Sequence, residues 1–270
     1  MCGRRTSCTW GRGRHPANPT DRRTSLRSPL QALQAVGVAA MSTMTKNWDR
    51  HVIDGEAVAR CPGFLSLRER ILELAQPESH HRAVDVGSGT GLLALPLADQ
   101  VEHVWAVDLS VGMTDYLRAK ASSAGLENLQ AVASSAVSLP LVDDAVDLVV
   151  SNYCFHHLDD AGKHLAMLEA WRVLRPGGRL VFGDMMFGLG LGDARDREVL
   201  TQKVRAMLRK GVPGVVRLLK NAGRVASGRW EHPARADWWA HELRRAGFID
   251  VGVEVLNHEG GLAWAKKPAR

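Results

Sequence analysis

The 270-residue sequence lacks several features that would identify its class at once. It has only four cysteines, and none stands at the spacing of paired metal ligands. We therefore expect neither a disulfide framework nor a metal site, and we expect a reducing, cytoplasmic setting. No apolar run approaches the ~18 residues that a transmembrane helix requires.

Acidic residues are scarce in residues 1–40, which contain seven arginines, one aspartate and no lysine. The chain has 35 basic and 29 acidic residues, which leaves 28 of each in residues 41–270. The body is therefore neutral and does not indicate a nucleic-acid-binding surface. The composition of residues 1–40 predicts a disordered tail. A transit peptide, a nucleic-acid-binding arm and a translation start at Met41 or Met44 all stay open.

Glycine is concentrated in Val84-Asp-Val-Gly-Ser-Gly-Thr-Gly91, between two apolar segments. The pattern predicts a buried strand at 82–86, a tight turn and a helix at 90–99. Glycine permits the backbone angles of such a turn and lets a ligand approach the main chain. Packing between strand and helix is the structural alternative.

A second apolar strand is predicted at 104–108 and ends in Asp108, 21 residues after Gly87. An acid at this distance can accept hydrogen bonds from the ribose hydroxyls of a nucleoside. A helix-capping role for Asp108 or Ser110 is the alternative. The glycine spacing is not Gly-x-Gly-x-x-Gly, so the dinucleotide fingerprint is absent.

The rest of the core alternates between strands and helices, which predicts a parallel sheet with helices on both faces. Arg175-Pro-Gly-Gly178 is interpreted as a turn from helix to strand. The segment 45–76 is predicted to be helical with a break at Pro62, and the C-terminal part a helix followed by a hairpin. The remaining predicted elements are strands at 129–133, 146–151 and 178–184, helices at 111–124, 160–173 and 234–246, and hairpin segments at 248–256 and 261–265.

Together these motifs resemble class I S-adenosylmethionine-dependent methyltransferases over roughly residues 47–266. Further landmarks are Leu139-Pro140, Asp147-Leu-Val-Val-Ser151 and Leu174-Arg-Pro-Gly-Gly-Arg-Leu180. Within the family the chain is most similar to small-molecule enzymes of ubiquinone and menaquinone biosynthesis. The resemblance implies a methyltransferase domain at 41–270 with a helical cap at 185–232. It also implies an α/β, Rossmann-like, seven-stranded, mostly parallel sheet whose last strand is antiparallel.

The resemblance implies S-adenosyl-L-methionine as cofactor and an N-terminal helix folded over it, so that Trp48 and His51 line the site. Packing of both residues on the edge of the sheet is the alternative. The sequence departs from the family at Ser135, where an aspartate commonly holds the adenine. A serine hydroxyl or the Ala136 backbone N–H is expected there instead. The cofactor-binding residues that the resemblance implies are Asp85, Gly87, Ser88, Gly89, Gly91, Asp108, Leu109, Ser135, Ala136 and Ser151.

The segment Ser151–Leu158 follows the fourth strand, where the family places the methyl group and its acceptor. It lacks the Asn-Pro-Pro-Tyr type of signature, so no nucleic-acid substrate is expected. Tyr153 and His156 are the candidate catalytic residues, because a histidine can take a proton from a phenol or carboxylic acid. Alternatively, His157 only starts the next helix, capped by Asp159 or Asp160.

The predicted cap carries an apolar helical stripe and, over 193–229, ten basic residues against three acids. A solvated helix pair explains this pattern. The sharper hypothesis is a cover for a small, apolar or acidic methyl acceptor, with peripheral contact to an anionic membrane. A non-catalytic nucleoside-binding module and an NAD-dependent oxidoreductase are the alternative functions. The acceptor and the oligomeric state are not indicated.

Overall fold

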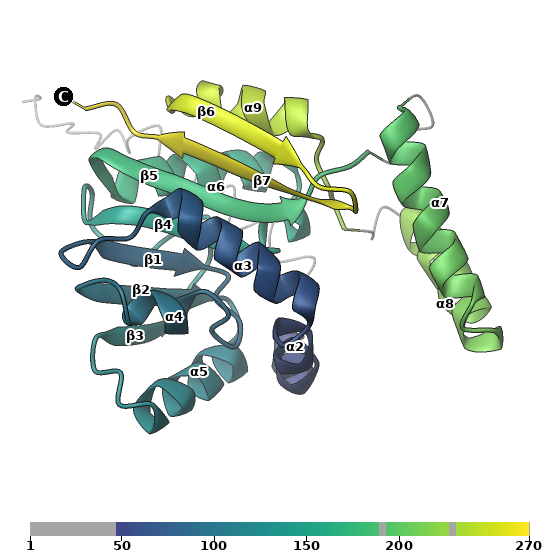
Figure 1. The fold of residues 1–270 in the computed structure, drawn as a ribbon, viewed down its shortest axis with the longest axis horizontal. Coiled ribbons are helices and arrows are strands. Elements are labelled where there is room, and N and C mark those ends of the chain that lie inside the picture. Colours follow the sequence, from purple (N-terminus) through teal and green to yellow (C-terminus); the bar gives the residue numbers. More distant parts are fainter. Residues whose placement is uncertain (1–46, 189–192, 227–230, 270) are drawn as a thin grey trace, which may run out of the picture.

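The computed structural model describes residues 47–188, 193–226 and 231–269. Its centre is a seven-stranded sheet in the order β3-β2-β1-β4-β5-β7-β6. β7 runs antiparallel to both of its neighbours, and the pairs from β3 to β5 are parallel, as predicted (Figure 1). The strands are β1 (Arg82–Val86), β2 (His103–Asp108), β3 (Leu129–Ala133), β4 (Val146–Asn152), β5 (Leu174–Met185), β6 (Ile249–Val255) and β7 (Gly260–Lys266).

Helices cover both faces of the sheet, because neighbouring residues of each buried strand point to opposite sides. Ala83 and Leu148 pack against α3, α4 and α5, whereas Val84 and Val149 pack against α6 and α9. This two-sided burial explains the nearly continuous apolar runs of β1 and β4. The helices are η1 (Trp48–His51), α2 (Val52–Ala59), α3 (Pro62–Ala75), α4 (Ala94–Ala98), α5 (Val111–Ser123), η2 (Phe155–His157), α6 (Asp160–Val173), α7 (Ala194–Leu208), α8 (Val212–Ala226) and α9 (Ala236–Arg245).

Two predicted boundaries were wrong. α4 begins at Ala94 and not at 90, because Gly91 has a φ of +93° and cannot be helical. β5 begins at Leu174, so the Arg-Pro-Gly-Gly segment is an irregularity within a strand and not a turn before one. Its register shifts between the Val146–Leu174 and Leu148–Arg179 pairs.

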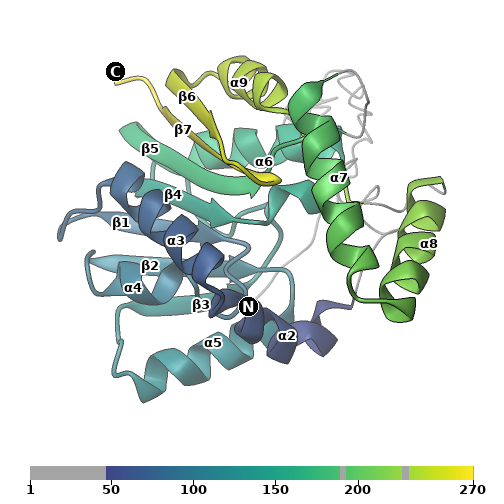
Figure 2. The ribbon, with the colours of Figure 1, turned by 45° about the vertical axis from the view of Figure 1, so that its right-hand side comes forward.

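The helices α7 and α8 form a hairpin that stands beside the carboxyl ends of the parallel strands (Figures 1 and 2). The start of this hairpin is anchored by several hydrogen bonds. Arg195 donates to the carbonyl oxygens of Met186, His258 and Gly260, and Asp193 caps α7. The predicted cap at 185–232 spans this hairpin, and the boundaries of that cap and of the 41–270 domain stay predictions. The tail predicted at 1–40 lies outside the described residues.

Candidate cofactor and acceptor site

The loop after β1 needs glycine for two different physical reasons. Gly87, Gly89 and Gly91 all have positive φ, at +72°, +51° and +93°. A Cβ on Gly87 would lie 2.4 Å from the Cys154 sulfur, and one on Gly91 would lie 2.4 Å from a Leu117 methyl. A Cβ on Gly89 would meet nothing within 4 Å. Close packing therefore excludes a side chain at Gly87 and Gly91. At Gly89 there is room for one, and only the positive φ favours glycine.

Asp108, at the end of β2, holds the glycine loop in place. Its carboxylate accepts hydrogen bonds from the backbone N–H groups of Gly89 at 2.8 Å and Ser110 at 2.9 Å. Burial raises the pKa of Asp108, against the effect of these bonds. The capping role belongs to Ser110, whose hydroxyl accepts from Met113 N at the start of α5. Each Asp108 oxygen keeps capacity for a further donor.

A pocket of about 600 Å³ opens beyond the carboxyl ends of β1, β2 and β4. Gly91 is buried against Leu95 and Leu117 and does not line it. Ser151 is fully buried and donates to the Val86 carbonyl oxygen at 2.7 Å, so it lies behind the pocket wall. The other predicted site residues all line the pocket: Asp85, Gly87, Ser88, Gly89, Asp108, Leu109, Ser135, Ala136, Tyr153 and His156.

Three buried polar atoms on the pocket wall have no hydrogen-bond partner within the described part of the chain. They are Asp85 Oδ2, Ser88 Oγ and Asn152 Oδ1. Burial raises the pKa of Asp85 to about 8, and the Asp108 charge adds to this while a backbone bond from Ala94 opposes it. Buried polar groups are costly to leave unpaired, so this wall is suited to a ligand with hydrogen-bonding groups.

The N-terminal elements cover the pocket, and Trp48 and His51 both line it. Asp49 fixes this cover, because its Oδ1 accepts from the Ser110 hydroxyl at 2.5 Å and from Gly112 N at 2.9 Å. These bonds, led by that from Ser110, lower the pKa of Asp49. Sequence reasoning missed Asp49, since nothing in its local pattern predicts a partner 61 residues away.

The side of the pocket next to η2 contains a buried histidine–aspartate pair. His156 Nδ1 lies 2.5 Å from Asp184 Oδ1, and the His156 backbone N–H donates to the same carboxylate. Asp184 sits near the end of β5 and is fully buried, while His156 is 5% exposed. Asp184 therefore fixes the orientation of the ring. It is a second residue that sequence reasoning missed, although its place at a strand end was a usable signal.

Other groups surround His156. Tyr153 has a φ of +53° and lies edge-on to it at 5.7 Å between ring centroids. Burial raises the pKa of Tyr153, so its phenol stays protonated. The His157 ring is tilted against both neighbours, with its centroid 3.9 Å from that of His156 and 4.6 Å from that of Trp48. Glu231 places a carboxylate oxygen within 4.8 Å of nitrogen atoms of both histidines.

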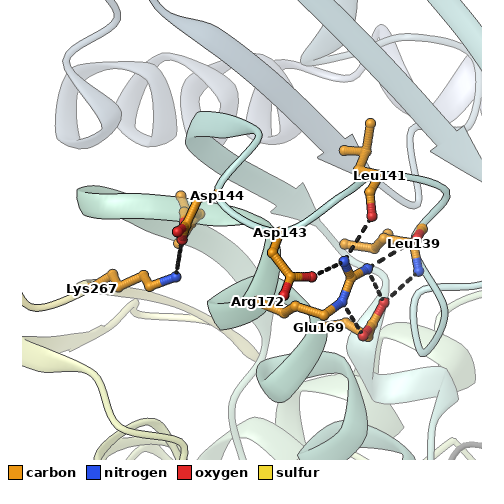
Figure 3. Close-up of polar contacts among 8 residues, drawn as sticks. Leu139, Leu141, Asp143, Asp144, Glu169, Arg172 and Lys267 are labelled. Atoms are coloured by element: carbon orange, nitrogen blue, oxygen red, sulfur yellow. Dashed lines mark hydrogen bonds and ion pairs between the residues drawn. The ribbon is translucent and has the colours of Figure 1, made fainter. Parts of the chain in front are cut away.

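The loop that brings Ser135 and Ala136 to the pocket is held from behind by α6 (Figure 3). Glu169 accepts from Leu139 N at 2.8 Å and pairs with Arg172. Arg172 also donates to the carbonyl oxygens of Leu139 and Leu141. These ion pairs raise the pKa of Arg172. The Leu139-Pro140 motif is thus where α6 holds the loop that follows β3.

A glycine loop and an acid on the next strand, at this edge of a 3-2-1-4-5-7-6 sheet, define a nucleoside-binding α/β protein. A family model described as "Methyltransferase domain" matches residues 84–182. The chain is 32% identical over 200 residues to the uncharacterized methyltransferase YcgJ of Bacillus subtilis, covering 70% of this chain and 74% of YcgJ. The chain belongs to this methyltransferase family.

A further relative agrees on the class, and a solved structure agrees on the fold. The chain is 37% identical over 119 residues to demethylmenaquinone methyltransferase of Thermus thermophilus, covering 43% of this chain and 53% of that one. Its fold matches Haemonchus contortus phosphoethanolamine N-methyltransferase 2 in complex with S-adenosyl-L-methionine, with a TM-score of 0.62 at 17% identity over 82% and 57% of the chains.

The protein is an S-adenosyl-L-methionine-dependent methyltransferase of class I. The oxidoreductase and non-catalytic alternatives are therefore set aside. In the described part of the chain, no helix is long and apolar enough to cross a membrane.

Proposed function

We propose that the protein methylates a small, apolar or acidic molecule at a protic oxygen or carbon, with His156 as the proton acceptor. The observation that carries the proposal is the buried His156–Asp184 pair, whose histidine lines the pocket. When bound, S-adenosyl-L-methionine supplies an activated methyl group, so the chain itself has to align two ligands, exclude water and accept a proton.

The proposed cofactor contacts follow from the polar wall. Asp108 is proposed to accept from the ribose hydroxyls, with Leu109, Ser135 and Ala136 around the adenine. The unpartnered Asp85, Ser88 and Asn152 oxygens suit the amino-acid end of the cofactor, whose ammonium group is a donor. The space beside Gly89 is open, so the cofactor can approach its backbone closely. Cofactor and cavity are thus compatible in chemistry.

The remaining wall indicates the class of acceptor. Val58, Phe64, Leu92 and Leu158 make it apolar. Of the described residues that line it, Arg217 is the only lysine or arginine. An apolar body with one acidic group matches such a pocket. A resemblance to enzymes of quinone biosynthesis supports the same class of molecule.

In the proposed reaction, His156 Nε2 accepts the proton that the acceptor loses when its oxygen or carbon gains the methyl group. The Asp184 carboxylate stabilises the imidazolium that forms, because it already bonds Nδ1. Trp48 and the N-terminal cover exclude water from this end of the pocket.

The test uses methyl-labelled S-adenosylmethionine with a panel of apolar phenols, enols and carboxylic acids. We expect label in one of these classes, and a loss of kcat of about a hundredfold or more in His156→Ala. Asp184→Asn should lower kcat and shift the pH profile, while cofactor affinity by calorimetry stays unchanged.

His241→Ala, at an exposed position on α9, is the control variant. Full activity in His156→Ala would remove the histidine from the chemistry. Label that enters only amines would contradict the proposed acceptor class.

A further inference from the structure

The α7–α8 hairpin combines two properties that the pocket does not use. Residues 199–226 contain seven lysines and arginines and no acid. Within the described part of the chain, Arg205, Arg209, Lys210 and Lys220 have no carboxylate within ion-pairing distance. Their charge is therefore available to an external anionic partner.

An apolar stripe lies on α8 beside these cations. Its residues follow the i, i+3, i+4, i+7 spacing of a single helix face. All four are exposed: Val212 at 76%, Val215 at 42%, Val216 at 44% and Leu219 at 69%. Leu208, at the end of α7, is 51% exposed and precedes the stripe. A run of large apolar side chains in water on one helix face indicates a contact surface.

Helix packing fixes which face of α8 is exposed. Gly214 is buried, and a Cβ there would lie 1.7 Å from the Met207 carbonyl oxygen, so α8 meets α7 through this glycine. Asn221, two turns later on the same face, contacts the Met207 sulfur. At 3.6 residues per turn, the stripe is turned away from this interface.

The stripe also points away from the pocket. Arg217 lines the pocket from α8. On a helical wheel it lies roughly 150° from the centre of the stripe. Closing the hairpin over the pocket would therefore not bury Val212 or Leu219. No other described segment of the chain covers this face of α8.

We propose that α8 and the α7–α8 turn dock on the surface of an anionic lipid bilayer. The stripe Val212–Leu219 enters the acyl boundary, while Arg205, Arg209, Lys210 and Lys220 contact lipid phosphates. A second copy of the chain is a poorer partner, because a symmetric contact through the stripe would bring the same cations together, and residues 199–226 contain no acid to pair with them. This inference does not depend on the identity of the methyl acceptor.

The experiment is co-sedimentation of the full chain with phosphatidylcholine vesicles, with and without phosphatidylglycerol. We expect binding only to the anionic vesicles, weakened by salt. The triple variant Arg205→Gln, Arg209→Gln, Lys210→Gln should bind them about a hundredfold less tightly, at roughly fivefold per charge. It leaves the apolar stripe intact, so it tests the charges alone.

The stripe is tested with a matched pair of variants. Val212→Glu and Val142→Glu change side chains that are both 76% exposed, but Val142 lies in the loop before β4. Val212→Glu should reduce vesicle binding at least tenfold and Val142→Glu by no more than its added negative charge, roughly fivefold. Cofactor affinity by calorimetry should stay unchanged in both.

Three outcomes overturn the proposal: no sedimentation of wild-type protein with anionic vesicles, equal binding to neutral vesicles, or equal losses in Val212→Glu and Val142→Glu. Light scattering measures the oligomeric state and so tests a second copy of the chain as the partner. A dimer that Val212→Glu dissociates, without vesicle binding, would assign the stripe to a second copy of this chain.

Discussion

The two sides of the pocket are built in different ways. The proposed cofactor side is formed by the ends of β1 and β2, and its loop is held by backbone hydrogen bonds and close packing. The proposed acceptor side is formed by side chains from distant segments, including His156, Asp184 and Arg217. The first side therefore depends on local packing, whereas the second depends on contacts between segments far apart in the chain.

The largest expected effect tests the rigidity of the cofactor side. Gly87→Ala should lower the free energy of unfolding by about 3 kcal/mol, because it adds a Cβ at positive φ against Cys154. Gly89→Ala should lower it by about 1 kcal/mol, since only its φ is unfavourable. Urea unfolding measures both. Equal losses would show that packing does not distinguish the two glycines.

The next effect is expected at Asp108, where a substitution should weaken cofactor binding more than it affects folding. Asp108→Ala should weaken S-adenosylmethionine binding tenfold or more, because a charge-assisted bond is worth on the order of 1.5–3 kcal/mol. Part of the loss comes from the glycine loop, which loses its bond at Gly89. Calorimetry measures the affinity, with the exposed Asp115→Ala as control. Unchanged affinity would place Asp108 outside the cofactor site.

The support behind the pocket should be nearly as sensitive. Arg172→Met leaves Glu169 and two carbonyl groups without their partner, which should cost about 2 kcal/mol. Arg175→Met removes a more exposed pair with Asp147 and should cost below about 1 kcal/mol. Thermal unfolding compares them. A larger loss at Arg175 would show that the loop after β3 is supported differently.

The raised pKa of Asp85 predicts a pH dependence of cofactor binding. Below about pH 8 the free protein holds Asp85 protonated, and a cationic ligand favours the ionised form. Affinity should therefore rise by up to about tenfold per pH unit from pH 6 and level off near pH 8, with proton release on binding.

Calorimetry in two buffers of different ionisation enthalpy measures that proton. Asp85→Asn should release none, and the same release in wild type and variant would assign the proton to another group. In the free protein, Asp85 has the opposite effect: its contribution to the stability of the fold changes with pH in the reverse direction. Its stabilising contribution falls as pH rises from its unfolded pKa toward 8, because the ionised form is the one that burial penalises.

The smallest effect is expected in the hairpin. Val212→Ser changes an exposed side chain and should alter the free energy of unfolding by less than about 0.5 kcal/mol. Val84→Ser, at a fully buried position of β1, is the contrasting variant and should lower the free energy of unfolding several times more. If the two changes cost the same, the hairpin is part of the core and the comparison fails.

The sequence by itself determined the elements whose signals are local. The glycines predicted the turn after β1, where the structure has positive φ, and the apolar runs predicted the strands. The position of Asp108 at the end of an apolar run predicted an acid at the end of β2. Asp159 was one of two predicted caps, and it does cap α6. Strand alternation with helices was enough to place these loops at one sheet edge, because parallel strands end together.

Only the tertiary structure decided contacts between segments far apart in the chain. The bonds from Asp184 to His156 and from Asp49 to Ser110 join residues 28 and 61 positions apart. The irregular start of β5 depends on its pairing with β4. The α8 stripe reads like a core stripe in sequence, and only the contact of Gly214 with α7 shows that it faces outward. A local sequence pattern shows how apolar a helix face is. The arrangement of the whole chain determines what that face packs against.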